Sequence, residues 1–251
     1  EFQIVPHKTT TLVQAYAEAI YDAPLDLYRV YFALYVKGLT QEAAAEELNY
    51  CTEYIRMKNK KLLSDIKEYL KYYENQVLED WYELIRHISV SETGEGIETC
   101  CDWIQKKMEE IGIQVTKYSV KPAPVLVGRF GNDPEKKTVL IYAHYDVKPA
   151  GERKLWHSDP FVPTVRDGKV YARGSADNKS PLMAHLKALE YFVRKKMEVP
   201  VNVIFVFEGD EECGSRGLEE FLAEHRTELA ADLVFFSDGP KDPSGLPIIA
   251  L

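Results

Sequence analysis

From residue 113 onward, short apolar runs alternate with amphipathic helical patterns, and no other feature of the sequence constrains the fold as strongly. The strand-like runs are QVTKYSV, PVLVGRF, KTVLIYA, VNVIFVF and DLVFFS, and the helical patterns are PLMAHLKALEYFVRKK and RGLEEFLAEHRTEL. Apolar strands that alternate with amphipathic helices are typical of an α/β layer on a largely parallel sheet. The sequence therefore predicts an α/β domain with a mostly parallel sheet flanked by helices.

The first seventy or so residues show helical periodicity and little strand signal. The helical runs are DLYRVYFALYVKG, QEAAAEEL, which Thr40 is predicted to cap, and EYIRMKNKKLLSDIKEYLKYY. Two more amphipathic helices, LEDWYELIRHI and IETCCDWIQKKMEEIG, lead into the α/β part. We therefore expect a domain boundary at about residues 73–78, with a small all-α segment over 1–75 and the α/β domain over 76–251.

Composition and charge argue against several classes of protein. The formal net charge of the 251 residues is −9, so bulk electrostatics do not favour nucleic-acid binding. No apolar run approaches the length of a membrane span and the N-terminus carries no signal pattern, so we expect no membrane association. The four cysteines form no C-x-x-C pair, which is typical of a reduced, cytoplasmic protein.

Acidic residues follow three of the predicted strands. The KTVLIYA strand runs into His144 and Asp146, the DLVFFS strand runs into Asp238, and a further acid, Asp177, precedes a predicted helix. The VNVIFVF strand runs into four acids within five residues, namely Glu208, Asp210, Glu211 and Glu212. Ligands bind beyond the carboxyl ends of parallel strands, so we expect these groups at one edge of the sheet. Clustered carboxylates repel one another unless a positive charge compensates, and one His with several carboxylates suits a divalent metal ion or a pair.

Four motifs carry a resemblance to a known family. They are AHYDVKPAG, LWHSDPFVPTVRDGKVYARGSADNKSP, FVFEGDEECGSRGL and FFSDGP, in that order. They resemble the zinc metallopeptidase family of carnosinases, cytosolic dipeptidases, carboxypeptidase G and acetylornithine deacetylase, and most of all its carnosinase-like dipeptidase branch. The resemblance covers about residues 77–251 and stops before the lid domain of that family. It implies a metal-dependent hydrolase of dipeptides or short peptides, and an acyl-amino-acid deacylase of the same family is the alternative.

The resemblance also implies a site with two zinc ions. His144 resembles the ligand of one zinc, Asp177 the carboxylate that bridges both ions, and Asp238 the remaining carboxylate ligand of the first. Glu212 resembles a ligand of the second zinc. Manganese and cobalt also suit sites that are rich in carboxylates. The last His ligand of the family lies beyond His225, the final His of this sequence, so we expect the second metal site to be incomplete as given.

Two further acids resemble catalytic residues of the family. Glu211 resembles the general base that takes a proton from the metal-activated water, and Asp146 resembles the acid that orients His144. In that family a lid domain also forms a homodimer, which is the predicted oligomer.

Other polar residues in the motifs have structural interpretations. Asp159, together with His157, is expected to shape a loop. Arg173 and Lys179 are expected to pair with nearby acids. Cys213 and His185 are expected to pack rather than to bind metal.

The N-terminal segment carries a second resemblance. Residues 25–72 resemble the helix-turn-helix of phage-type transcription regulators and of sigma factors, with Arg56, Lys58 and Lys60 on the helix that would enter the major groove of DNA. Nearby glutamates largely cancel this charge, and many three-helix units bind protein or simply pack. The sequence leaves both interpretations open, so the second hypothesis for the whole chain is a DNA-binding regulator that carries an inactive, truncated hydrolase domain.

Overall fold

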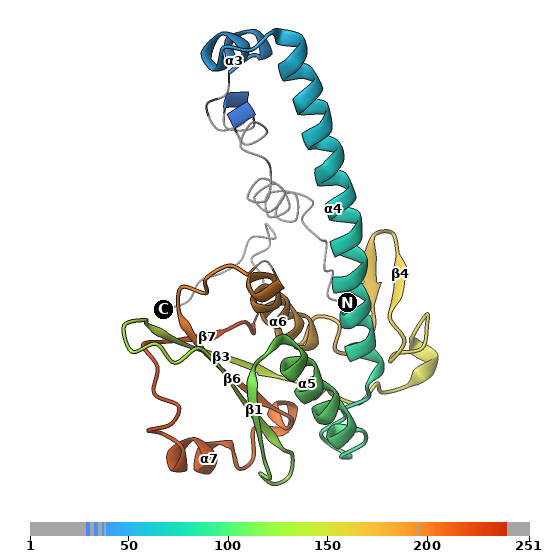
Figure 1. Ribbon diagram of the computed structural model, residues 1–251. Helices are drawn as coiled ribbons and strands as arrows, with labels where there is room; N and C mark the ends of the chain where they lie inside the picture. Colours follow the sequence, from blue (N-terminus) through green and yellow to red (C-terminus); the bar gives the residue numbers. More distant parts are fainter. Residues whose placement is uncertain (1–28, 31–32, 35–36, 38, 195, 240–251) are drawn as a thin grey trace. The chain divides into compact units, whose positions relative to one another are not determined.

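The computed structural model describes residues 29–30, 33–34, 37, 39–194 and 196–239, and these form two compact units that divide between Glu79 and Asp80 (Figure 1). The predicted helix over DLYRVYFALYVKG lies largely outside the described residues. Among the described helices, none combines the length and the apolar character that crossing a membrane requires.

The N-terminal unit is helical where it is described. Helix α3 spans Gln41–Leu48, and the side chain of Thr40 accepts a hydrogen bond from the backbone N–H of Ala43 at 3.2 Å, so the predicted N-cap is confirmed. The helix ends at Asn49, which adopts a left-handed conformation with φ 56°. A small apolar cluster holds the unit together, namely Val30, Ala33, Ala44, Ala45 and Ile55.

Helix α4 spans Thr52–Arg86, a single helix of 35 residues. The sequence predicts two helices here, divided near residues 74–79, and that division is wrong. The reason is local, because residues 52–86 contain neither Gly nor Pro, so nothing in the chain ends the helix between the two apolar patterns. The assignment of domains to 1–75 and 76–251 stays a prediction.

The second unit is built on a five-stranded sheet in the order β1-β2-β6-β3-β7. The strands are β1 Gln114–Tyr118, β2 Val125–Phe130, β3 Thr138–His144, β6 Asn202–Glu208 and β7 Leu233–Phe236. Strand β3 is parallel to both β6 and β7, and β2 is antiparallel to β1 and β6. Four of the five strands therefore run in one direction, which confirms the predicted mostly parallel sheet. A short hairpin of β4 Thr164–Arg166 and β5 Lys169–Tyr171 lies apart from this sheet.

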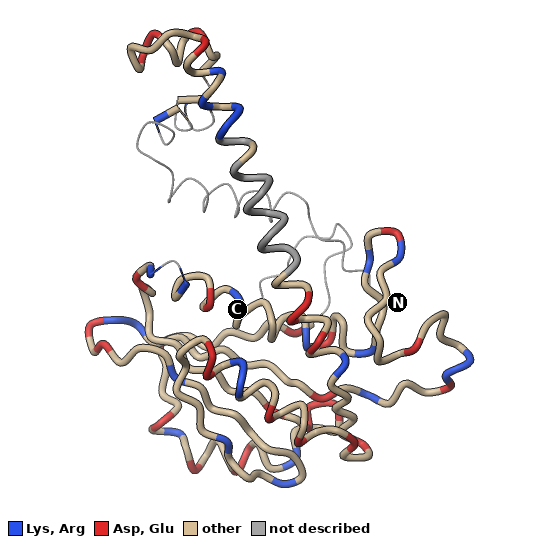
Figure 2. Tube along the Cα trace, turned by 45° about the vertical axis from the view of Figure 1, so that its right-hand side comes forward, with Lys and Arg blue, Asp and Glu red and all other residues tan. Residues whose placement is uncertain are grey.

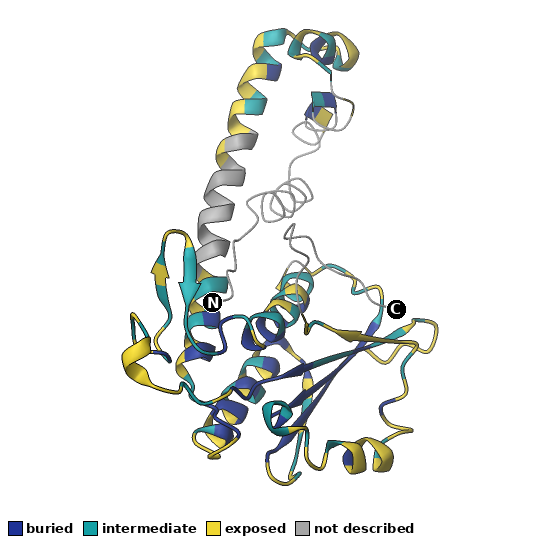
Figure 3. Ribbon diagram, turned by 180° about the vertical axis from the view of Figure 1, so that it is seen from behind, coloured by how far each residue is buried: buried dark blue, intermediate teal, exposed yellow. Residues whose placement is uncertain are grey.

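Helices cover one face of the sheet. Helix α5, Ile97–Ile111, contacts β1 and β2, and helix α6, Lys179–Arg194, contacts β3 and α5 (Figure 1). Strand β6 is buried along its whole length, which accounts for its unbroken apolar sequence (Figure 3). At Gly128 of β2 a Cβ would lie 2.2 Å from Cε of Met108 in α5, so the helix packs closely against the strand at this glycine.

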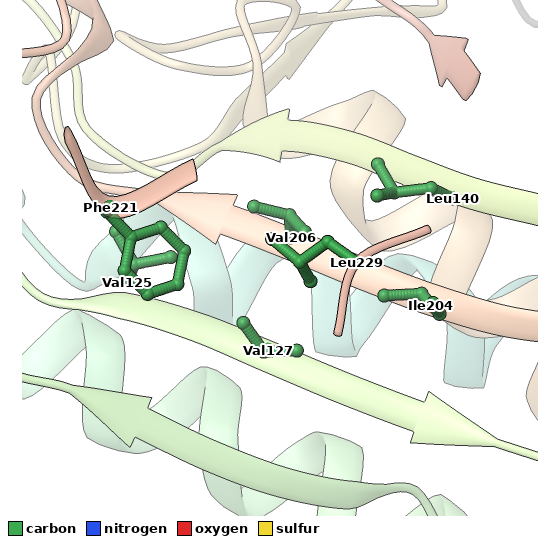
Figure 4. Packing of buried hydrophobic residues seen from close by; sticks show 7 residues of the cluster. All are labelled: Val125, Val127, Leu140, Ile204, Val206, Phe221 and Leu229. Atoms are coloured by element: carbon green, nitrogen blue, oxygen red, sulfur yellow. The ribbon is translucent and has the colours of Figure 1, made fainter. Parts of the chain in front are cut away.

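The opposite face carries an apolar cluster between the strands and the chain around α7, Leu218–Glu224. Its buried members are Val125, Val127, Leu140, Ile204, Val206, Phe221 and Leu229 (Figure 4). The two faces together bury the central strands, so their carboxyl ends emerge as a fixed edge. His144, the last residue of β3, pairs with Glu208, the last residue of β6, and Tyr142 pairs with Phe236 of β7. The predicted edge, at which three strands end together, is therefore present.

Candidate metal centre

Three acid-bearing segments converge on His144 at this edge. The Nε2 atom of His144 lies 3.1 Å from Oδ1 of Asp177, two residues before α6, and 3.2 Å from Oδ2 of Asp238, two residues after β7. A ligand atom from each of these three residues lies within 4.8 Å of the other two. Oε2 of Glu211 lies slightly farther out, 3.7 Å from the same nitrogen.

The pKa of His144 shows how strongly the surrounding carboxylates favour a positive charge. The side chain is completely buried. Burial alone would lower the pKa of His144, but the carboxylates of Asp146, Asp177 and Asp238 raise this pKa to about 12. The three carboxylates therefore favour positive charge next to Nε2, and a metal ion would take the place of the proton there, because a histidine ligand is neutral. An imidazole nitrogen with carboxylate oxygens is a donor set that suits zinc and similar divalent ions, so the residues present fit a metal.

Asp146 links His144 to the loop that follows β6. Its buried carboxylate lies 3.2 Å from Nδ1 of His144, the ring nitrogen that faces away from Asp177. Its two oxygens accept backbone N–H groups of Glu211 at 3.1 Å and Glu212 at 3.0 Å. Burial raises the pKa of Asp146, but the hydrogen bonds from His144, Ser91 and the Glu212 backbone outweigh burial and lower it. Asp146 therefore stays ionised and fixes both the ring and the loop.

The four clustered acids after β6 divide into two pairs, and the inner pair is satisfied by protein groups. Glu208 accepts hydrogen bonds from the hydroxyl of Tyr142 at 2.6 Å and from that of Ser215 at 2.8 Å. Burial raises the pKa of Glu208. The carboxylate of Asp210 is held by Arg216, through Nε at 2.9 Å and Nη2 at 2.7 Å. These two acids are therefore structural, and their partners supply much of the compensation that the cluster needs.

The outer pair, Glu211 and Glu212, lies on a single 3-10 turn, Glu211–Cys213, and both side chains line a cavity of about 970 Å³. Burial raises the pKa of Glu211; His144 opposes this, but Glu212 and Asp238 add to it. Glu212 lies 3.0 Å from Nζ of Lys148 and is outside the His144 group. Within the described part of the chain, only one cluster suited to a metal is assembled, so a second ion at Glu212 stays a prediction.

The cavity brings the acids together with apolar side chains. Its polar lining includes Asp177 and Asp238 besides Glu211 and Glu212. Its apolar lining comes from the sheet and from the chain around α7, namely Leu140, Val206, Leu218, Leu222, Leu229, Val234 and Phe236. The cavity therefore places a group of carboxylates next to an apolar wall.

Two predictions about neighbouring basic residues are wrong, because neither residue forms an ion pair with an acid in the part of the chain that the structure describes. Arg173 donates to the backbone oxygen of Pro149 at 3.3 Å and lies over the ring of Trp156. Lys179 is buried and donates to backbone oxygens at the end of α4. In both cases the partners are backbone carbonyl groups 24 or more residues away in the sequence, which local sequence patterns do not reveal.

Three other motif residues make contacts within the protein. Asp159 accepts from the backbone N–H of Phe161 at 2.9 Å and so shapes its loop. Cys213 lies 3.5 Å from the hydroxyl of Ser91, and His185 lies 2.6 Å from that of Ser237, and neither belongs to the metal group. Sequence reasoning missed Lys148, although the AHYDVKPAG motif places it four residues after His144.

The predicted DNA-contacting residues lie in the first turns of α4, where Figure 2 shows basic positions in blue. Arg56 forms an ion pair with Glu53 at 2.5 Å, and Nζ of Lys58 lies 5.2 Å from the ring centre of Tyr54. Lys60 is exposed. Arg56 and Lys58 thus contact side chains of their own helix. DNA binding stays a prediction.

Comparison with known proteins agrees with the geometry. Residues 140–248 match the model of Peptidase family M20/M25/M40. A Cys-Gly metallodipeptidase of Schizosaccharomyces pombe is 43% identical over 147 residues, which are 55% of this chain and 31% of the relative. The chain covers between 23% and 39% of the length of such curated relatives.

Solved structures show the same likeness in the fold. An M20 family metallo-carboxypeptidase from Sulfolobus solfataricus is 36% identical, with a TM-score of 0.64, over 67% of this chain and 38% of that one. Human carnosine dipeptidase 1 is 29% identical, with a TM-score of 0.65, over 68% of this chain and 40% of that one. The α/β unit is therefore similar to metallopeptidases of this family in both sequence and fold, and the dipeptidase relatives support the predicted branch.

Proposed function

We propose that the α/β unit provides the metal centre of a zinc-dependent hydrolase that cleaves dipeptides or short peptides. The observation that carries the proposal is the group of His144, Asp177 and Asp238, whose ligand atoms lie within 4.8 Å of one another. These residues would hold one zinc ion, and Asp177 with Glu212 would reach toward a second. The similarity to metallodipeptidases supports the substrate class, since dipeptides are what those relatives are named for.

A bound zinc would lower the pKa of a water ligand and polarise the scissile carbonyl. Glu211 suits the role of general base, because its carboxylate lies beside the metal group without being part of it and faces the cavity. It would take a proton from the water at Oε2 and pass it to the leaving amine. The raised pKa of Glu211 favours the first transfer, because a more basic carboxylate takes up a proton more readily.

Asp146 would position His144 and Glu211 without contacting the metal itself. By contacting Nδ1 of His144 it leaves Nε2 to face the metal, and by accepting the backbone N–H groups of the Glu211 turn it holds the base at a fixed distance. One buried carboxylate thus positions a ligand and the base together.

The test uses the full chain loaded with zinc and two dipeptides, Cys-Gly and β-Ala-His, with an N-acyl amino acid as the competing substrate class. Glu211→Gln keeps the size of the side chain and removes the base, so we expect it to bind zinc like the parent and to lose activity by about 10²–10⁴-fold. A zinc-loaded parent that cleaves neither dipeptide would contradict the proposal. Cleavage of the N-acyl amino acid alone would favour the deacylase alternative.

A further inference from the structure

Lys179 is buried in an unusual environment for a lysine. It is the first residue of α6, it is 1% exposed, and it follows Asp177 by two residues. Its Nζ donates to the backbone oxygen of Leu84, in the last turn of α4, at 3.2 Å and to that of His87, just beyond the helix, at 2.6 Å. Burying an ammonium group is costly unless hydrogen bonds replace its water. The last carbonyls of a helix lack partners within the helix and carry the negative end of its dipole, so each group satisfies the other.

The segment that follows α4 also holds the other two loops of the site. The hydroxyl of Ser89 donates to the backbone oxygen of Tyr145 at 2.7 Å, and the backbone oxygen of Ser89 accepts from the backbone N–H of Val147 at 2.8 Å. Two residues on, the hydroxyl of Ser91 lies 3.5 Å from Sγ of Cys213, on the turn that carries Glu211. Residues 87–91 therefore contact the loop after β3, the loop after β6 and, through Lys179, the turn that carries Asp177.

Of these three segments, the Asp177 turn depends most on such an anchor. The side chain of Asp177 is 55% exposed, whereas that of His144 is completely buried, so packing around the carboxylate does not position it. The turn packs closely below it, because a Cβ at Gly174 would lie 2.7 Å from Cγ1 of Val147 and 3.2 Å from Cδ of Lys179. The buried Lys179 stem and its two carbonyl bonds therefore hold the turn on the side of α4, while Nδ2 of the buried Asn178 ties it to the backbone oxygen of Ser237 at 3.1 Å.

We propose that Lys179 is a positioning residue of the metal centre. By tying the Asp177 turn to the end of α4, it keeps the Asp177 carboxylate within reach of Nε2 of His144. This inference rests on the proposed function, because it assigns Lys179 a role in a metal site.

Helix α6 offers a matched control in Lys187. Its ammonium also ties α6 to α4, through Asp80, and it pairs with Glu190 as well. The Lys187 side chain is 12% exposed, but it lies two turns farther along α6 from Asp177. Lys187→Met therefore removes another ammonium link between the same two helices, here an ion pair, and leaves the Asp177 turn anchored.

The experiment compares Zn²⁺ dissociation constants of the full-length parent, Lys179→Met and Lys187→Met, by competition with a chromophoric chelator, next to their urea midpoints. Removal of a residue that supports a metal ligand weakens metal binding by about 10–100-fold. We expect this loss in Lys179→Met and a loss of less than about threefold in Lys187→Met, even where both variants lose stability.

If Lys179→Met does not fold, Lys179→Arg takes its place, because the larger planar guanidinium keeps the charge but cannot occupy the position of the ammonium. Zinc affinity within about threefold of that of the parent, in either folded variant, overturns the inference. A parent that binds no zinc refutes the proposed function and this inference with it. Tight zinc binding by both the parent and Lys179→Met refutes only the role of Lys179.

Discussion

Replacement of Asp146 by Asn is the sharpest test of how the site is held together. The side chain keeps its shape, but one of the two oxygens becomes an amide group that cannot accept a hydrogen bond. At least one backbone N–H, from Glu211 at 3.1 Å or from Glu212 at 3.0 Å, then loses its partner, and the charge beside His144 disappears. An unpaired buried donor costs about 1–3 kcal/mol, and removal of one partner of a buried ion pair costs about 3–5 kcal/mol. These costs overlap, so we expect a loss of about 3–5 kcal/mol in the free energy of unfolding.

The assay is urea unfolding of the metal-free full chain at pH 7, with Asp159→Asn as the control. Asp159 also accepts a backbone N–H and pairs with an arginine, Arg153, but its side chain is 44% exposed. Exposed pairs contribute at most about 1 kcal/mol, so the control is expected to unfold close to the parent. Equal unfolding midpoints for Asp146→Asn and Asp159→Asn would refute the claim that Asp146 joins the histidine to the Glu211 loop.

Two further predictions concern the frame around the site. Gly209→Ala would place a Cβ 2.5 Å from Cζ of the buried Tyr145 ring, so we expect a loss of about 1–3 kcal/mol in the free energy of unfolding, and an unchanged urea midpoint would contradict this packing. Burial raises the pKa of Asp80, but the ammonium groups of Lys187 and Lys107 outweigh burial and lower this pKa. The ion pairs of Asp80 therefore stabilise the fold above pH about 4. This stabilisation is lost as the pH falls through the lowered pKa. Asp80→Asn should therefore cost about 1–2 kcal/mol at pH 7 and progressively less in acid, and a cost that does not change with pH would rule out the ion pairs as its source.

Periodicity along the chain predicted the sheet well, because each strand and helix of the α/β unit has its own hydrophobic pattern in the sequence. The convergence of His144 and Asp238 followed from one rule, namely that parallel strands end at the same edge, and Asp177 joins them from the turn before α6. It required no knowledge of side-chain contacts.

Other features depend on partners that no local pattern reveals. The sequence shows four adjacent acids, but only the fold shows that Tyr142, on a neighbouring strand, binds Glu208 and so removes it from the site. Lys179 was expected to pair with an acid, and instead it contacts Leu84, 95 positions earlier in the chain. Helix α4 runs on through Glu79 because residues 52–86 contain neither Gly nor Pro, and two separate apolar patterns do not by themselves show that a helix ends between them.

The most direct test of the account is the amount of zinc that each chain retains after dialysis, measured by elemental mass spectrometry on the parent and on Asp177→Ala. Because one His and two Asp residues converge on one point, we predict about one firmly held zinc ion per parent chain. Loss of Asp177 removes one of the three protein ligands, so the variant should retain almost none. A parent without zinc, or an Asp177→Ala variant that holds as much zinc as the parent, would contradict the central claim that these residues form a metal centre.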